Sequence, residues 1–131
     1  MNLFVYGTLL EEKVWLSVAG KSYKSVSAKL YGYSCKKLKN RPYPGLIQEK
    51  GSTVNGIVYL NIAEKTISQL DIFEGVEYKR IKVTVDSLDN GEMICDTYLF
   101  KEEFSDLVLK KEWSLEEFKN IDMCHFLTDE F

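Results

Sequence analysis

Apolar residues along the chain follow patterns that predict short strands and two helices. An apolar run over residues 3–6 ends at Gly7, which is typical of a buried strand that enters a tight turn. Alternation, or a high content of β-branched and aromatic residues, predicts further strands over residues 25–34, 46–47, 53–61, 78–86 and 93–100. Apolar spacings of three and four residues predict helices over residues 11–19 and 63–74.

Capping residues predict where the helices begin. Thr8 and Glu11 have the T-x-x-E spacing of a capping box, so Thr8 is expected to cap the first helix. Ser114 and Glu117 repeat this pattern and predict a C-terminal helix that runs to about Phe126. Three helices are therefore expected outside the strands.

Turn residues separate the predicted strands. The basic stretch 36–41 and the following Pro42-Tyr43-Pro44-Gly45 predict a loop with a restricted backbone. Gly51-Ser52 predicts a turn, and Asp89-Asn90-Gly91 is a strong hairpin signal. Six or so strands, mostly joined by hairpins, together with three helices predict an α+β fold whose sheet is closed or nearly closed.

Length and charge exclude several classes of protein. The chain has 131 residues, enough for one domain over 1–131. Its net charge is −3, from 17 Lys and Arg against 20 Asp and Glu, which argues against nucleic acid as a partner. It contains no apolar run near the roughly 20 residues that span a bilayer, and its start has no basic leader. We therefore expect a cytoplasmic protein with no membrane partner.

The few cysteines and the single histidine restrict the available chemistry. Cys35, Cys95 and Cys124 lie far apart without metal-ligand spacing, and His125 is the one histidine. We therefore expect no metal and no cofactor, and catalysis by carboxylates and backbone groups. A thiol enzyme that uses Cys124 or Cys35 is an alternative, although Cys124 and His125 as helix neighbours would not face each other.

Glu74 breaks the pattern of the second predicted helix. It follows Ile67 by seven residues and Leu70 by four, so it shares their apolar face. A carboxylate in that position is costly unless it is paired or used. Three interpretations are open: fraying of the helix end, a general acid or base with a raised pKa, or a salt bridge with Arg80 or Lys79.

The turn at Tyr6-Gly7-Thr8-Leu9 also has two compatible interpretations. It can be a strand exit with a helix cap, or a site where free N–H groups behind a glycine bind a carboxylate. Tyr43 and Tyr78 are more often packing residues, but their predicted loop positions allow contact with a ligand.

Four motifs, in this order, resemble those of the gamma-glutamylcyclotransferase-like family, which includes gamma-glutamylamine cyclotransferases. They are Val5-Tyr6-Gly7-Thr8-Leu9, Tyr43-Pro44-Gly45, Asn55-Gly56-Ile57-Val58-Tyr59 and the block from Leu70-Asp71-Ile72-Phe73-Glu74-Gly75 to Arg80. The last is similar to the family pattern L-D-x-F-E-G-x-x-Y-x-R. After the turn this chain has Leu10-Glu11-Glu12, where relatives often have a basic residue and a glycine.

The resemblance implies a small mixed six- or seven-stranded β-barrel with flanking helices. It implies that Glu74 is the catalytic acid or base and that the turn from Tyr6 to Leu9 binds the glutamyl group, with Tyr43, Pro44, Gly45 and Tyr78 as further binding residues. The expected activity releases 5-oxoproline and a free amine from a small-molecule gamma-glutamyl amine or peptide. A non-catalytic binding module on the same barrel is the alternative. The leaving amine and the oligomeric state stay open.

Overall fold

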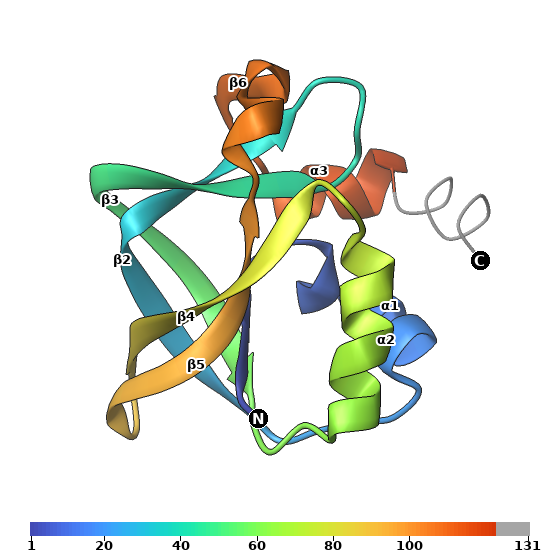
Figure 1. The fold of residues 1–131 in the computed structure, drawn as a ribbon, viewed down its shortest axis with the longest axis vertical. Coiled ribbons are helices and arrows are strands. Elements are labelled where there is room, and N and C mark those ends of the chain that lie inside the picture. The colour runs from blue at the N-terminus through green and yellow to red at the C-terminus, as the bar shows by residue number, and fades with distance from the viewer. Residues whose placement is uncertain (123–131) are drawn as a thin grey trace.

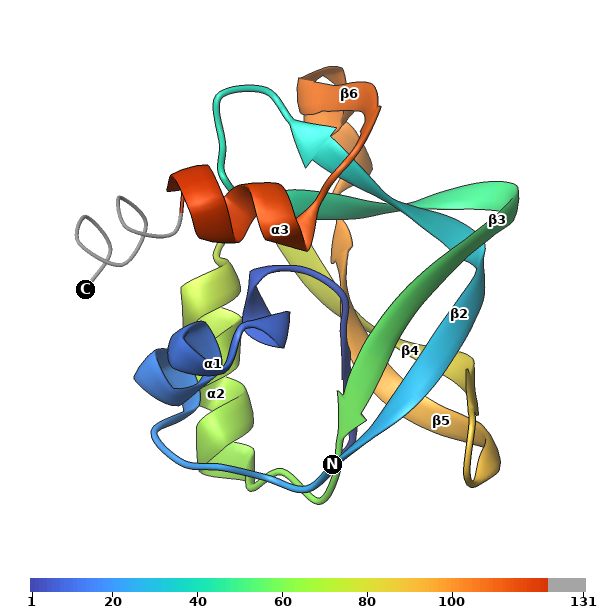
Figure 2. The ribbon, with the colours of Figure 1, turned by 180° about the vertical axis from the view of Figure 1, so that it is seen from behind.

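The centre of the molecule is a β-barrel that five strands close (Figures 1 and 2). The computed structural model describes residues 1–122. The barrel order is β3-β1-β5-β4-β2, and β2 pairs back onto β3. Strands β1 and β5 run parallel and the other neighbours antiparallel. The strands are β1 (Leu3–Val5), β2 (Ser25–Leu38), β3 (Pro44–Tyr59), β4 (Tyr78–Ser87), β5 (Gly91–Phe100) and β6 (Val108–Glu112).

The predicted α+β barrel is confirmed. Strand β6 pairs with β2 outside the closed part, so the barrel itself has five strands and the sheet has six. The helices are α1 (Glu12–Ala19), α2 (Glu64–Glu74) and the short α3 (Leu115–Glu117). Two 3₁₀ turns are also present, η1 (Thr8–Leu10) before α1 and η2 (Glu102–Leu107) between β5 and β6, and a π turn η3 (Phe118–Asp122) follows α3.

The two longer helices lie side by side next to the barrel (Figure 2). Trp15 of α1 stacks on Tyr59 of β3, with ring centroids 3.7 Å apart. Ile67 and Leu70 of α2 are fully or almost fully buried in the same core. The predicted apolar face of residues 63–74 is therefore confirmed, and through this face the helix packs against the barrel.

The ribbon formed by β2 and β3 is longer than predicted. Residues 36–38 belong to β2, because Lys36 and Lys37 pair with Gly45 and Pro44. The loop predicted over residues 36–41 is therefore wrong in its first half. Charged side chains at these positions remain compatible with a strand because Lys36 bonds Glu112 of β6 across the surface.

The turn predicted at Gly51-Ser52 is also wrong. Strand β3 continues through these residues, and the β2–β3 register shifts between Tyr31 and Tyr33. Gly51 and Gly32 both have a positive φ, of 88° and 85°, at this irregularity. The glycines therefore make a bulge in a continuous ribbon, which adds the bend that a small barrel requires.

The first capping prediction is wrong and the second is confirmed. Residues 8–10 form a 3₁₀ turn, so α1 begins one turn later and Glu11 caps it by accepting from Lys13 N. Ser114 does cap α3, accepting from Glu117 N at 3.2 Å. The end of the predicted C-terminal helix, with Cys124, His125 and Phe126, lies outside the described residues.

The predicted hairpin over residues 89–91 is confirmed, since β4 and β5 pair from Ser87–Gly91 to Tyr78–Phe100. Gly91 takes a positive φ of 69° at the end of this hairpin turn.

Within residues 1–122 no helix is long and apolar enough to cross a membrane.

Candidate active site

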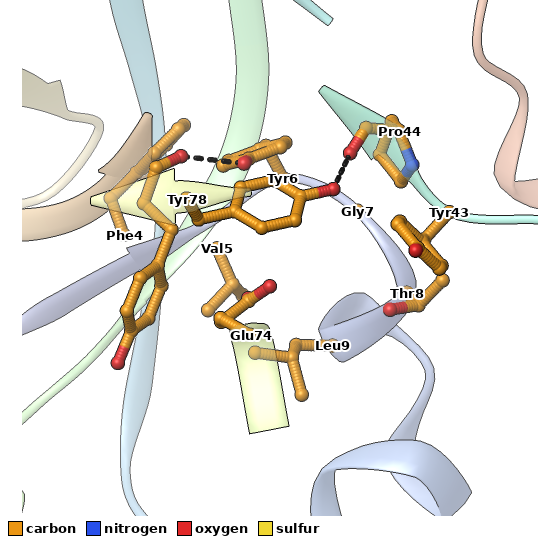
Figure 3. A pocket seen from close by; sticks show the side chains of 11 residues that line it. Phe4, Val5, Tyr6, Gly7, Thr8, Leu9, Tyr43, Pro44, Glu74 and Tyr78 are labelled. Atoms are coloured by element: carbon orange, nitrogen blue, oxygen red, sulfur yellow. Dashed lines mark hydrogen bonds between the residues drawn. The ribbon is translucent and has the colours of Figure 1, made fainter. Parts of the chain in front are cut away.

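A small pocket lies where the turn after β1 meets the C-terminal end of α2 and the first residues of β3 and β4 (Figure 3). The pocket is partly open to solvent. Its lining residues are Phe4, Val5, Tyr6, Gly7, Thr8, Leu9, Tyr43, Pro44, Glu74, Tyr78 and Tyr98. Five elements of the fold therefore build one site: β1 with its following turn, the start of β3, the end of α2, the start of β4, and β5.

Every residue predicted for the site lines this pocket except Gly45. A Cβ on Gly45 would lie 3.0 Å from both Leu38 Cδ2 and Phe100 Cγ. The glycine thus allows the backbone to pass close to two core side chains, and this contact holds the neighbouring Pro44 at the pocket wall.

Phe4, Val5 and Tyr98 line the pocket but were not predicted. Phe4 and Val5 belong to the strand that leads into the turn, so their position next to Tyr6 in the sequence could have indicated that they line the pocket. Tyr98 comes from β5, which reaches the site through its parallel pairing with β1. Sequence alone carries no sign of that pairing.

Glu74 is the last residue of α2, and its side chain points between Val5 and Leu9 into the pocket (Figure 3). The helix end is closed by Gly75 N, which donates to Asp71 O at 3.2 Å. Fraying of this end, one of the sequence interpretations, is therefore absent. Burial first, and then the charge of Asp71, raise the pKa of Glu74 to about 8.

The salt bridge considered for Glu74 does not form. Arg80 instead bonds Asp71 at 3.0 Å and Asp96 at 2.5 Å. Among the described residues, no Lys or Arg forms an ion pair with Glu74. The remaining interpretation is a carboxyl group that is available for chemistry.

Three tyrosines surround Glu74, and each hydroxyl donates elsewhere. Tyr6 donates to Tyr98 O at 2.6 Å, and Tyr78 donates to Pro44 O. Tyr98 donates to Asp71 Oδ1 at 2.7 Å. Because a hydroxyl has one proton to donate, none is left for the Glu74 carboxylate. Burial raises the pKa of all three phenols, so they stay neutral.

The turn opposite Glu74 presents unpaired backbone groups. Within residues 1–122 the N–H groups of Gly7, Thr8 and Leu9 have no bonded acceptor, while Leu10 N and Glu11 N close the turn onto Gly7 O and Thr8 O. Thr8 and Leu9 are buried. Buried N–H groups without a partner are costly, so a bound anion or carbonyl oxygen would be stabilised there.

The rim of the pocket is fixed by a clamp of three side chains. Arg41 donates to both carboxylate oxygens of Glu77, at 3.1 Å and 2.6 Å. Tyr43 donates to the same carboxylate at 3.2 Å. Trp113 adds a bond to Pro42 O at 2.8 Å. The loop that carries Tyr43 and Pro44 is thereby tied to Glu77, directly before β4, and to Trp113, directly after β6.

The described thiols do not have the properties of nucleophiles. Burial raises the pKa of Cys35 to about 12 and that of Cys95 to about 11, so little thiolate exists at neutral pH. Neither thiol lines the pocket of Glu74. Among residues 1–122 no group of three or more His, Cys, Asp or Glu side chains is arranged to hold a metal ion.

Comparison with known proteins shows the family of this chain. The model of the family described as gamma-glutamyl cyclotransferase, AIG2-like, matches residues 3–115. AIG2-like protein C of Arabidopsis thaliana is 37% identical over 128 residues, which cover 97% of this chain and 74% of that protein. Protein AIG2 C of the same plant is 34% identical over 127 residues, 96% of this chain and 76% of its own length.

Solved structures share the same barrel. A solution structure of an Arabidopsis thaliana protein superposes with a TM-score of 0.75 at 30% identity, covering 98% of this chain and 86% of that one. A structure described as gamma-glutamyl cyclotransferase has a TM-score of 0.68 at 20% identity and covers 76% and 66% of the two chains, which indicates a common fold. On the match over most of its length, this chain belongs to the gamma-glutamyl cyclotransferase, AIG2-like family.

Proposed function

We propose that the protein is a cyclotransferase that converts a gamma-glutamyl amine or peptide into 5-oxoproline and a free amine. The observation that carries this proposal is the Glu74 carboxyl group, whose pKa is raised to about 8 and which faces a turn with unpaired N–H groups. Family membership supports the reaction type.

Binding would place the two ends of the glutamyl group on different parts of the pocket. The α-carboxylate would accept from N–H groups of Gly7, Thr8 and Leu9, and the α-ammonium would lie against Glu74. The tyrosine hydroxyls are committed to other acceptors, so the backbone of the turn is also the favoured donor to the developing oxyanion.

Glu74 would carry two protons, one after the other, from the attacking nitrogen to the leaving nitrogen. Its ionised carboxylate takes a proton from the α-ammonium, and the freed amine attacks the γ-carbonyl carbon of the same molecule. A new C–N bond closes the five-membered ring. Protonated Glu74 then returns its proton to the leaving nitrogen as the original amide bond breaks. The ring nitrogen still holds one proton too many, and Glu74 takes this second proton and passes it to the released amine, which departs as an ammonium. Two protons thus leave the attacking nitrogen and two reach the leaving nitrogen, so atoms and charge balance without a water molecule or a co-reactant.

A pKa of about 8 suits both halves of this cycle. It lies near the range in which α-amines titrate, so proton transfer in either direction costs little. Holding the amine against the carbonyl can contribute about 7–11 kcal/mol to lowering the barrier. General acid–base catalysis adds on the order of 10²–10⁴-fold.

The decisive experiment incubates the protein with a panel of gamma-glutamyl amines and dipeptides and measures 5-oxoproline by mass spectrometry. Glu74→Gln keeps the shape of the side chain but cannot carry the proton, so we expect at least a hundredfold loss of turnover with ligand binding retained. Glu64→Gln, at the exposed start of the same helix, is the matched control and should keep wild-type turnover. Normal turnover by Glu74→Gln would overturn the mechanism.

Thermal shift with glutamate, 5-oxoproline and the same dipeptides tests the non-catalytic alternative. Saturable stabilisation of the wild-type protein without product would favour a binding module on this barrel. Product formation that depends on Glu74 would exclude that module.

A further inference from the structure

We propose that Asp71 is a positioning residue for Glu74, because its carboxylate ties the last turn of α2 to strands β4 and β5. This inference rests on the proposed function and concerns a residue outside the pocket lining. Asp71 lies one helical turn before Glu74, so it holds the segment that carries the catalytic carboxyl.

The tie has two arms. Tyr98 of β5 donates to Asp71 Oδ1 at 2.7 Å. Arg80 of β4 donates from Nε to Oδ1 at 3.0 Å and from Nη2 to Oδ2 at 3.4 Å. Arg80 is itself held by Asp96, a residue of β5 that is only 3% exposed. The helix end is therefore attached to two barrel strands through one carboxylate.

Of the apolar residues in the last turn of α2 and directly after it, Phe73 packs against the core, whereas its neighbours are exposed. Ile72 and Val76, on either side of Glu74, are 81% and 76% exposed. Leu70 is fully buried, but it lies a full turn further from the pocket. Beyond that residue, the polar tie of Asp71 and the half-buried ring of Phe73 fix the helix end. Small displacements of a reacting group can cost on the order of 10²-fold in rate.

Asp71 also acts on Glu74 electrostatically. Burial is the main cause of the raised pKa of Glu74, and the like charge of Asp71 is the second. The other titratable groups that line the pocket with Glu74 are neutral phenols from the turn after β1, the loop before β3, β4 and β5: Tyr6, Tyr43, Tyr78 and Tyr98. Removing the charge of Asp71 should therefore lower the pKa of Glu74.

A purely structural Asp71–Arg80 ion pair and a positioning role for Asp71 predict different effects of Asp71→Asn on kcat and on its pH dependence. Asp71→Asn keeps the size and an acceptor for Tyr98 but removes the charge. We expect the acid limb of kcat/KM to move from about 8 to lower pH, by up to about one unit, and kcat to fall about tenfold. Asp86→Asn, an exposed carboxylate on β4 away from the pocket, is the matched control and should match the wild type.

Tyr98→Phe separates the tie from the charge. It removes one hydrogen bond to Asp71 while the aromatic ring stays at the pocket wall. We expect a several-fold lower kcat with the acid limb at the wild-type pH. This variant also carries the test if Asp71→Asn does not fold, as judged by circular dichroism.

An NMR titration of the Glu74 side-chain carboxyl gives a readout that is independent of activity. Glu74→Gln identifies the signal. We expect a midpoint near 8 in the wild type and a lower midpoint in Asp71→Asn. An unchanged midpoint together with wild-type kcat in Tyr98→Phe would overturn the role of Asp71, even if the wild type makes 5-oxoproline. A wild type that makes no 5-oxoproline would instead remove the proposed function, and the titration would then decide the effect of Asp71 on Glu74 by itself.

Discussion

Gly7 and Pro44 are in contact across the pocket: a Cβ added to Gly7 would lie 2.7 Å from Pro44 Cγ and 2.9 Å from Pro44 Cδ (Figure 3). The proline ring cannot rotate away as a flexible side chain can, and Pro44 O accepts the hydroxyl of Tyr78. The turn proposed to bind the glutamyl group therefore depends on the absence of a side chain at residue 7. This adds a second reason for glycine at a position where the sequence indicated a bare turn.

Gly7→Ala should consequently displace either the turn or the proline. We expect a loss of about 1–3 kcal/mol in the free energy of unfolding, measured by urea denaturation. Ligand affinity, measured by calorimetry with a gamma-glutamyl dipeptide, should fall by about tenfold or more because the N–H groups move. Pro44→Ala in the same chain should restore part of both losses, since it removes the ring. Additive losses in the double variant would show that the contact is not the cause.

Local patterns predicted the part of the site that a short segment determines. The spacing of Ile67, Leu70 and Glu74 on one helical face requires no knowledge of the rest of the chain, and α2 places Glu74 at the pocket as that spacing indicated. The hairpin at residues 89–91 was equally local. The turn from Tyr6 to Leu9 was found because strand exit and glycine lie next to each other in sequence.

Features that depend on pairing between distant segments were missed or mistaken. Tyr98 lines the pocket because β5 pairs with β1. The hydrogen bond from the Tyr6 hydroxyl to Tyr98 O joins residues that are 92 positions apart in the sequence. The sequence predicts a turn at Gly51, whereas opposite Gly32 this glycine forms a bulge in a continuous ribbon. A positive-φ glycine serves either purpose, and only the partner strand decides which.

The raised pKa of Glu74 should make stability depend on pH in a defined direction. The folded protein keeps the Glu74 proton up to about pH 8, whereas the unfolded chain releases it near 4.5. Between these values the native state binds more protons, so stability falls as pH rises. We expect the free energy of unfolding of the wild type, relative to Glu74→Gln, to decrease between pH 5 and 8 by on the order of a few kcal/mol. A difference that is constant in urea titrations from pH 5 to 9 would contradict the raised pKa.

Gly56 of β3 should be one of the least replaceable residues of the barrel. A Cβ there would lie 2.2 Å from Val5 O and 2.7 Å from the Phe4 ring, so β1 and β3 could no longer approach each other. We expect Gly56→Ala to lose about 3 kcal/mol or more of unfolding free energy, or to fail to fold. Asn55→Ala, at the exposed neighbouring position, is the control and should change stability by about 0.5 kcal/mol or less in thermal denaturation. Equal melting temperatures for the two variants would refute the steric argument.

The clamp of Arg41 and Glu77 should affect substrate binding more than chemistry. Glu77 orients Tyr43 at the pocket wall but does not line the pocket, so its charge is not part of the proposed proton transfer. Glu77→Gln keeps one acceptor and loses the bidentate ion pair with Arg41, which frees the loop that carries Tyr43 and Pro44. We expect KM to rise about three- to tenfold, with kcat within about twofold of the wild type. Glu112→Gln breaks an ion pair of similar kind between β6 and Lys36, away from this pocket, and should leave both constants unchanged. Steady-state kinetics on both variants gives the comparison, and a fall in kcat without a change in KM would place Glu77 in the chemical step instead.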